Sequence, residues 1–99
     1  MTIREENGAE GVVLFVEGKL TTNTAPELEP LLMEKVAAGG NVVLDFKQLD
    51  YLSSAGLRLL VGAQKSVNAN GGSLTIRHCD DDVQEIFEIT GLVDVLTIE

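Results

Sequence analysis

Residues 41–67 read NVVLDFKQLDYLSSAGLRLLVGAQKSV, and they predict a buried strand, a turn and an amphipathic helix in that order. The first six residues are almost all apolar, which is typical of a central strand covered on both faces. Residues 47–52 are expected to form a turn. From residue 57 onward apolar side chains recur at helical spacing. The predicted inner face of this helix comprises Leu57, Leu60, Val61, Ala63 and Val67.

Another helix is predicted before this strand. Thr24 and Glu27 have the spacing of a capping box, in which each side chain satisfies a backbone donor of the other residue, so we expect a helix to begin at Thr24. The pair Gly39 and Gly40 supplies a stop for it. Pro30 removes a backbone hydrogen bond about one turn into this helix, so we expect a kink or a later start.

The pattern continues after the central helix. Residues 73–77 alternate between apolar and polar side chains, as a strand does. Asp82 and Glu85 repeat the capping spacing, which predicts a third helix that ends at Gly91. Residues 93–98 are expected to form a last short strand.

The chain is predicted to open with a hairpin, because residues 2–6 alternate weakly, residues 8–11 suit a turn and residues 12–16 are β-branched or aromatic. The predicted order is strand, strand, helix, strand, helix, strand, helix, strand. Such an order favours a mixed, largely parallel five-stranded sheet with three helices, an α/β fold. We expect residues 1–99 to form a single domain.

Composition excludes several classes of function. The 99 residues contain 16 Asp and Glu against 7 Lys and Arg, a formal net charge of −9. Nucleic acid and anionic membranes are bound by clustered cations, so neither is an expected partner. Cys79 is the only cysteine, which fits a reducing compartment. The first residues lack the apolar core of a signal peptide, so we expect a cytoplasmic protein.

No catalytic motif stands out. The sequence contains neither a Walker loop nor a Gly-x-Ser-x-Gly elbow. His78 and Cys79 stand beside three aspartates, and a helix N-terminus capped by Asp explains this run better than a metal site does, because no His or Cys pair has ligand spacing. Cys79 is expected to be inert filler. We expect no enzymatic activity, no metal and no cofactor.

Residues 53–56, Ser-Ser-Ala-Gly, lie where the chain passes into the central helix. One interpretation is structural: Ser53 or Ser54 caps the helix, and Gly56 allows close packing against the sheet. The other is regulatory, because helix amides favour an anion and would tolerate a phosphate on such a serine. The spacing alone leaves both open.

Several pieces of the sequence together resemble the STAS domain, and specifically the stand-alone anti-sigma factor antagonists of bacteria. The main piece is Leu44-Asp45-Phe46, Leu49 and Tyr51-Leu52-Ser53-Ser54-Ala55-Gly56-Leu57-Arg58. Further similar pieces are Gly18-x-Leu20 through Thr24-Ala25, the Gly71-Gly72 turn and Ile89-Thr90-Gly91-Leu92. The resemblance covers nearly the whole chain.

This resemblance implies partner switching. The unphosphorylated antagonist binds an anti-sigma factor that is itself a serine kinase, and so frees the sigma factor. The kinase switches the antagonist off by phosphorylating the residue that corresponds to Ser54, and a PP2C-type phosphatase restores it. ATP would belong to the kinase. The expected partner-binding residues are Thr21, Asn23, Thr24, Ser53, Ser54, Gly56, Leu57 and Arg58.

Two alternatives remain open at this point. The chain could be a STAS regulatory or scaffold subunit of a transporter or of a sensory complex, and the domain could itself bind a nucleotide, although it has no phosphate loop. Ser53 and Thr21 occupy positions where many members of the family have acidic residues. Ser53 is also a second candidate phosphate acceptor.

Overall fold

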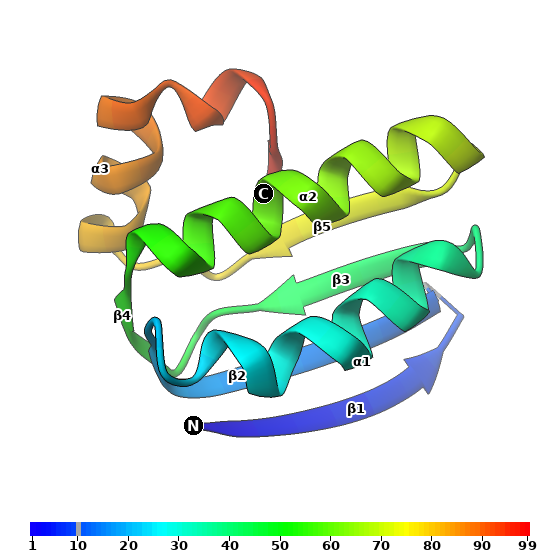
Figure 1. Ribbon diagram of the computed structural model, residues 1–99, viewed down its shortest axis with the longest axis horizontal. Coiled ribbons are helices and arrows are strands. Elements are labelled where there is room, and N and C mark those ends of the chain that lie inside the picture. Colours follow the sequence, from blue (N-terminus) through cyan, green and yellow to red (C-terminus); the bar gives the residue numbers. More distant parts are fainter. Residues whose placement is uncertain (10) are drawn as a thin grey trace.

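The computed structural model describes residues 1–9 and 11–99 (Figure 1). Its elements in chain order are β1 (Thr2–Gly8), β2 (Gly11–Leu20), α1 (Ala25–Ala37), β3 (Asn41–Asp45), β4 (Leu49–Leu52), α2 (Ser54–Asn70), β5 (Ser73–Arg77), α3 (Asp81–Thr90), the 3-10 turn η1 (Leu92–Asp94) and β6 (Thr97–Ile98). Within the described part of the chain, no helix has the length and apolar character needed to cross a membrane.

The strands form one mixed sheet in the order β1-β2-β3-β5-β6, and β4 pairs with β2 off this path. The pair β1 and β2 is antiparallel, and the other described pairs are parallel. The predicted α/β fold with an opening hairpin and a largely parallel sheet is therefore confirmed. The predicted hairpin turn includes residue 10, which lies outside the described residues.

The sheet has one strand more than predicted, because β4 replaces the second half of the turn expected at residues 47–52. Leu49 and Leu52 are buried while the two residues between them are exposed, so β4 shows no alternation of period two. β4 pairs with the last three residues of β2, and the register of this pairing shifts between Gly18 and Lys19. This long-range pairing leaves no local signal in the sequence.

The core lies between the sheet and helices α1 and α2, which cover the same face of the sheet (Figure 1). Leu14, Leu44 and Ile76 pair across β2, β3 and β5 and are completely buried on that face. The second covered face expected for β3 is not provided by these two helices. Val43 and Asp45 nevertheless stay buried there, with the residues paired to them on β2 and β5 beside them on that face.

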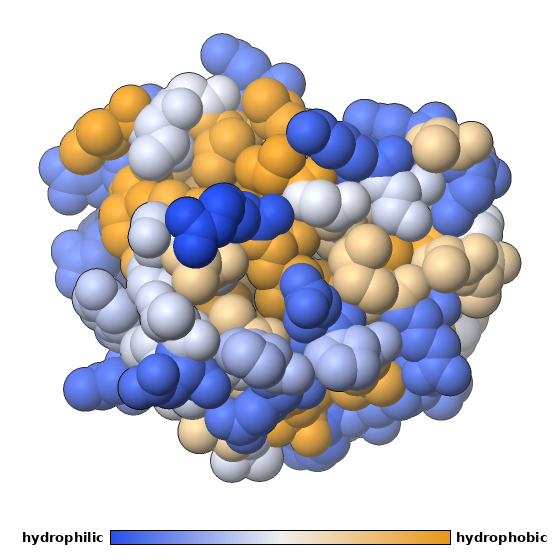
Figure 2. Space-filling view, viewed as in Figure 1, coloured by the Kyte–Doolittle hydropathy of each residue, from blue (hydrophilic) through white to orange (hydrophobic). Residues whose placement is uncertain are grey.

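The inner face of α2 differs in part from the prediction. Its buried residues are Gly56, Leu59, Leu60, Ala63, Gln64 and Val67. Leu57 and Val61, which were expected inside, are only half-buried. The buried face of α2 is therefore turned relative to the predicted one, so that Leu57 and Val61 remain partly accessible to solvent. Figure 2 shows apolar side chains gathered on the side of α2 that faces α3.

Helix α1 begins as predicted after Thr24, but the predicted capping box is wrong. The Thr24 side chain makes no capping hydrogen bond to the helix. Its hydroxyl instead donates to the carbonyl of Lys19 at 2.7 Å. The later start expected from Pro30 is also wrong, because the helix runs through it from Ala25. The carbonyl left without a donor belongs to Pro26 in the exposed first turn, where water can satisfy it.

Helix α3 begins two residues earlier than predicted, because it is capped by Asp80 and not by Asp82. The Asp80 carboxylate accepts a hydrogen bond from the Val83 N–H at 2.8 Å. Three consecutive aspartates offer equivalent caps, and the burial of Val83 and Phe87 selects among them. The predicted stop at Gly91 is confirmed by its φ of 77°. The last strand is shorter than predicted, because η1 occupies Leu92–Asp94.

Candidate functional site

Two chain segments meet at the carboxyl ends of β2 and β4. Leu20 and Leu52 pair in parallel register, and the Ser53 N–H donates to the Leu20 carbonyl at 2.9 Å. Because neighbouring parallel strands end at the same edge of a sheet, the β2–α1 turn and the start of α2 lie side by side there. The predicted site residues of both segments are thus brought together.

The β2–α1 turn, residues 21–24, is held by its own threonines. The Thr24 hydroxyl accepts a hydrogen bond from the Thr21 N–H at 2.7 Å while it donates to Lys19. The Thr21 hydroxyl accepts from the Asn23 N–H at 3.2 Å. Both hydroxyls are therefore used within the turn, whereas the Asn23 side chain is exposed. Thr21 and Thr24 shape this surface, and Asn23 presents a side chain on it.

The two serines at the start of α2 have different surroundings. Ser53 is the N-cap, and its hydroxyl accepts a long hydrogen bond of 3.4 Å from the Gly56 N–H. Ser54 is the first residue of the helix and is exposed. Its hydroxyl has no hydrogen-bond partner among residues 1–9 and 11–99. The structural interpretation thus holds for Ser53, and the Ser54 hydroxyl remains available to solvent.

Gly56 is the one predicted site residue that lies beneath the surface. A Cβ atom there would stand 2.7 Å from Leu52 Cδ1 and 2.9 Å from Leu20 Cγ, closer than ordinary van der Waals contact. The missing side chain therefore lets α2 approach β2 and β4 closely, as predicted from the sequence. Gly56 fixes the position of Ser54 two residues before it.

Two grooves flank α2. The larger, of about 520 Å³, lies between α2 and the segment that joins α3 to η1, and its walls include Ser54, Leu57, Arg58, Val61, Lys65 and Leu92. The other, of about 380 Å³, lies between α1 and α2 and includes Arg58 as well. Leu92 was not predicted as a neighbour of Ser54, because only the tertiary fold brings η1 beside α2.

The larger groove is apolar along its length and positively charged at its rim. Leu57, Val61 and Leu92 are half-buried along it, while Arg58 and Lys65 are exposed. Neither cation forms an ion pair with any residue that the structure describes. In a chain of net charge −9, this groove is suited to an apolar segment that carries acidic residues.

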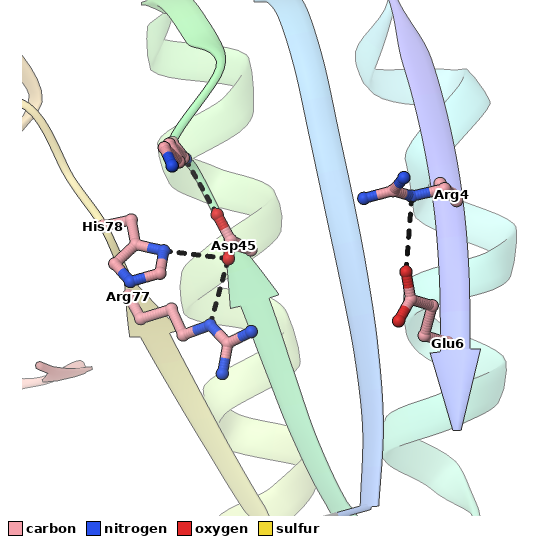
Figure 3. Close-up of polar contacts among 6 residues, drawn as sticks. Arg4, Glu6, Asp45, Arg77 and His78 are labelled. Atoms are coloured by element: carbon pink, nitrogen blue, oxygen red, sulfur yellow. Dashed lines mark hydrogen bonds and ion pairs between the residues drawn. The ribbon is translucent and has the colours of Figure 1, made fainter. Parts of the chain in front are cut away.

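A second polar cluster lies at the end of β3, away from α2 (Figure 3). Asp45 is only 4% exposed, and its Oδ2 accepts from Arg77 Nε at 3.0 Å and lies 2.9 Å from His78 Nδ1. Its Oδ1 accepts from the Lys47 N–H at 2.9 Å. Burial raises the pKa of Asp45, but these hydrogen bonds outweigh burial and leave that pKa below its usual value. Asp45 is therefore an ionised carboxylate that ties the β3–β4 connection to the β5–α3 connection.

No functional role was predicted for His78 and Cys79, and the contacts of both residues are explained by the fold alone. His78 has a φ of 60° and is tied to Asp45 where the chain turns toward α3. Burial, together with the charges of Asp80 and Asp45, raises the pKa of the Cys79 thiol to about 11. The thiol is therefore not a nucleophile near neutral pH, as predicted. The role of Asp45 was missed, although a charged residue in an apolar run is a signal for it.

Comparison with known proteins confirms the resemblance noted in the sequence. A family model described as the STAS domain matches residues 1–99. The chain belongs to the STAS domain family. The anti-sigma-B factor antagonist of Listeria monocytogenes is 32% identical to this STAS domain over 96 residues, which are 96% of this chain and 84% of that protein. The anti-sigma-B factor antagonist of Staphylococcus aureus is 36% identical over 84 residues, or 84% of this chain and 78% of that one.

Solved structures share the fold of this STAS domain. A putative anti-sigma factor antagonist from Thermotoga maritima superposes with a TM-score of 0.88 at 17% identity, covering 97% of this chain and 84% of that one. SpoIIAA in its unphosphorylated form has a TM-score of 0.78 at 16% identity, covering 99% and 87%. The phosphorylated form of SpoIIAA has a TM-score of 0.77 at 18% identity, covering 99% and 91%.

Proposed function

We propose that this STAS domain is an anti-sigma factor antagonist that acts by partner switching, with Ser54 as the phosphorylated residue. The observation that carries the proposal is the accessible Ser54 hydroxyl at the start of α2, next to a Ser53 hydroxyl that is engaged as the helix cap. Relatives that match most of the chain are named anti-sigma-B factor antagonists. The partner is then an anti-sigma factor that is also a serine kinase.

The partner binds the surface that combines the β2–α1 turn, the start of α2 and the larger groove. Asn23, Ser54, Leu57 and Arg58 present side chains on it, while Thr21, Thr24, Ser53 and Gly56 hold its shape. An apolar side chain of the partner fits between Leu57 and Leu92. Burial of one such side chain contributes about 1.5 to 3 kcal/mol.

Phosphorylation of Ser54 switches the partner off without unfolding the domain. The phosphate adds about −1.5 to −2 charges at one exposed point. The helix amides at the start of α2 favour this anion, so the fold tolerates it. A bound partner would have to desolvate the phosphate, and each loss of about 1.4 kcal/mol weakens binding tenfold. Removal of the phosphate by a PP2C-type phosphatase restores binding.

The decisive experiment incubates the purified chain with its cognate anti-sigma factor and ATP and maps the phosphate by peptide mass spectrometry. We expect phosphate on Ser54 in the wild type and in Ser53→Ala, and none in Ser54→Ala. Ser53→Ala is the matched control, since it removes the neighbouring hydroxyl at a cost of about 1 kcal/mol for the lost cap. Phosphate found only on Ser53, or on neither serine, would contradict the proposal.

A further inference from the structure

We propose that Arg58 is the residue that receives the phosphate of Ser54, and that this pairing draws the Arg58 guanidinium from the rim of the grooves into an intramolecular contact. This inference rests on the proposed function in taking Ser54 as the modified residue. Phosphorylation would then change the partner-binding surface in two places: at Ser54 itself and at Arg58, one helical turn away.

The geometry of α2 places the two side chains together. Residues four apart on a helix lie on the same face, about 5 to 6 Å apart at Cβ. Ser54 and Arg58 have this spacing, both are exposed, and both line the larger groove. A phosphate oxygen extends beyond the serine hydroxyl, so the long Arg58 side chain reaches it without a change of the backbone.

The charges around the site favour this pairing. Arg58 lines both grooves, and it forms no ion pair with any described residue, including Glu29 across the smaller groove. Its guanidinium is therefore available in the unphosphorylated protein. Lys65 is the other cation of the larger groove, but it lies further along α2. The β2–α1 turn, residues 21–24, contributes no charged side chain.

The chemistry selects Arg58 over a simple point charge. A guanidinium donates two parallel hydrogen bonds to phosphate oxygens, and such charge-assisted bonds are about twice as strong as neutral ones. Once Arg58 pairs with the phosphate, it no longer presents its charge to a carboxylate of the partner. Phosphorylation thus adds an anion to the surface and neutralises a cation beside it.

The test uses protein that carries phosphoserine at position 54, incorporated during translation, and a pH titration of its phosphorus NMR signal. We expect the pKa of the phosphate to be lower in the wild type than in Arg58→Ala by about half a unit, the size expected for a unit charge at this distance in a solvated site. Lys65→Ala removes an equal charge from the same groove and is expected to titrate as the wild type does. Arg58→Lys is expected to retain only part of the shift.

Two results would overturn the inference. The first is that the phosphate has the same pKa in the wild type and in Arg58→Ala. The second is that Lys65→Ala raises the phosphate pKa as much as Arg58→Ala does, which would show that the net positive charge of the groove acts on the phosphate and not a specific pair. Because the phosphoserine is incorporated during translation, this titration does not depend on any kinase. A failure of the kinase to modify Ser54 would contradict the proposed function while leaving the Arg58 result standing.

Discussion

At the scale of single residues, the buried carboxylate of Asp45 and the exposed hydroxyl of Ser54 have different roles in this domain. Asp45 accepts three hydrogen bonds at the end of β3 and ties the β3–β4 and β5–α3 connections together. Ser54 has no partner of this kind among the described residues. A residue whose bonds are all made inside the fold can stabilise it, whereas a residue that leaves its group to solvent can be modified without loss of the fold.

Asp45→Asn is expected to destabilise the domain at neutral pH by about 2 to 3 kcal/mol, because it removes the charge from hydrogen bonds to a buried carboxylate. The pKa of Asp45 is lowered in the folded state, so its contribution is fully present above the unfolded value of about 3.9 and is lost as the pH falls through the folded value. The measurement is urea unfolding of the wild type and the variant from neutral pH down to acid. The difference between them should shrink only below about pH 4.

The control for this change is Asp50→Asn, the same substitution at an exposed aspartate of β4. It is expected to change the stability by less than about 0.5 kcal/mol. An Asp45→Asn variant as stable as this control at neutral pH would show that the Asp45 cluster does not anchor the loops.

At the scale of elements, the distance between α2 and the strands β2 and β4 determines the position of Ser54 on the surface. Gly56→Ala is expected to destabilise the domain by about 1 kcal/mol or more, because overpacking against Leu52 and Leu20 outweighs the higher helix propensity of alanine. Gly62→Ala on the same helix meets no atom within 4 Å and is expected to stabilise by about 0.5 to 1 kcal/mol. Thermal unfolding of both variants measures this difference in sign. A stabilising Gly56→Ala would mean that close packing does not position α2.

Elements whose burial follows a local period were predictable from the sequence. The opening hairpin, α2 and β5 were found in this way, β3 was found from its continuous apolar run, and the junction at Ser53 followed from strand-to-helix order. β4 was missed because its two buried leucines are separated by two exposed residues and its partner lies in distant β2. The capping hydrogen bond of Thr24 was wrongly predicted because its hydroxyl donates to the Lys19 carbonyl instead. The cap of α3 was misassigned because Asp80 offers the same carboxylate as Asp82.

Both segments of the candidate site were predicted, residues 53–58 partly from the residues themselves and the β2–α1 turn from the family resemblance, but one wall of the larger groove was not. The exposed Ser54 and the close packing of Gly56 follow from residues 53–56 themselves. The wall formed by Leu92 does not, since η1 reaches α2 through tertiary packing alone. The half-exposure of Leu57 and Val61 was missed for a related reason: a helical period fixes the apolar strip, but the neighbouring elements decide how much of it they cover.

At the scale of the whole molecule, a net charge of −9 raises the question of whether one more negative charge acts locally or through the total field. Ser54→Asp and Ser73→Asp separate the two. Each adds one charge, but Ser73 is exposed at the start of β5, at the opposite end of the sheet from the start of α2. At physiological salt, interactions between exposed charges are screened beyond about 8 Å, so a distant charge is expected to be felt weakly.

Binding of the anti-sigma factor is therefore expected to weaken at least about tenfold in Ser54→Asp, equivalent to about 1.4 kcal/mol, and to change less than about twofold in Ser73→Asp. Ser54→Ala is expected to bind as the unmodified wild type does, and to keep binding after incubation with kinase and ATP. Calorimetric titration at low and at physiological salt measures all three. Equal weakening by both aspartates would assign the switch to the net charge of the molecule, and the surface at the start of α2 would then have no special part in it.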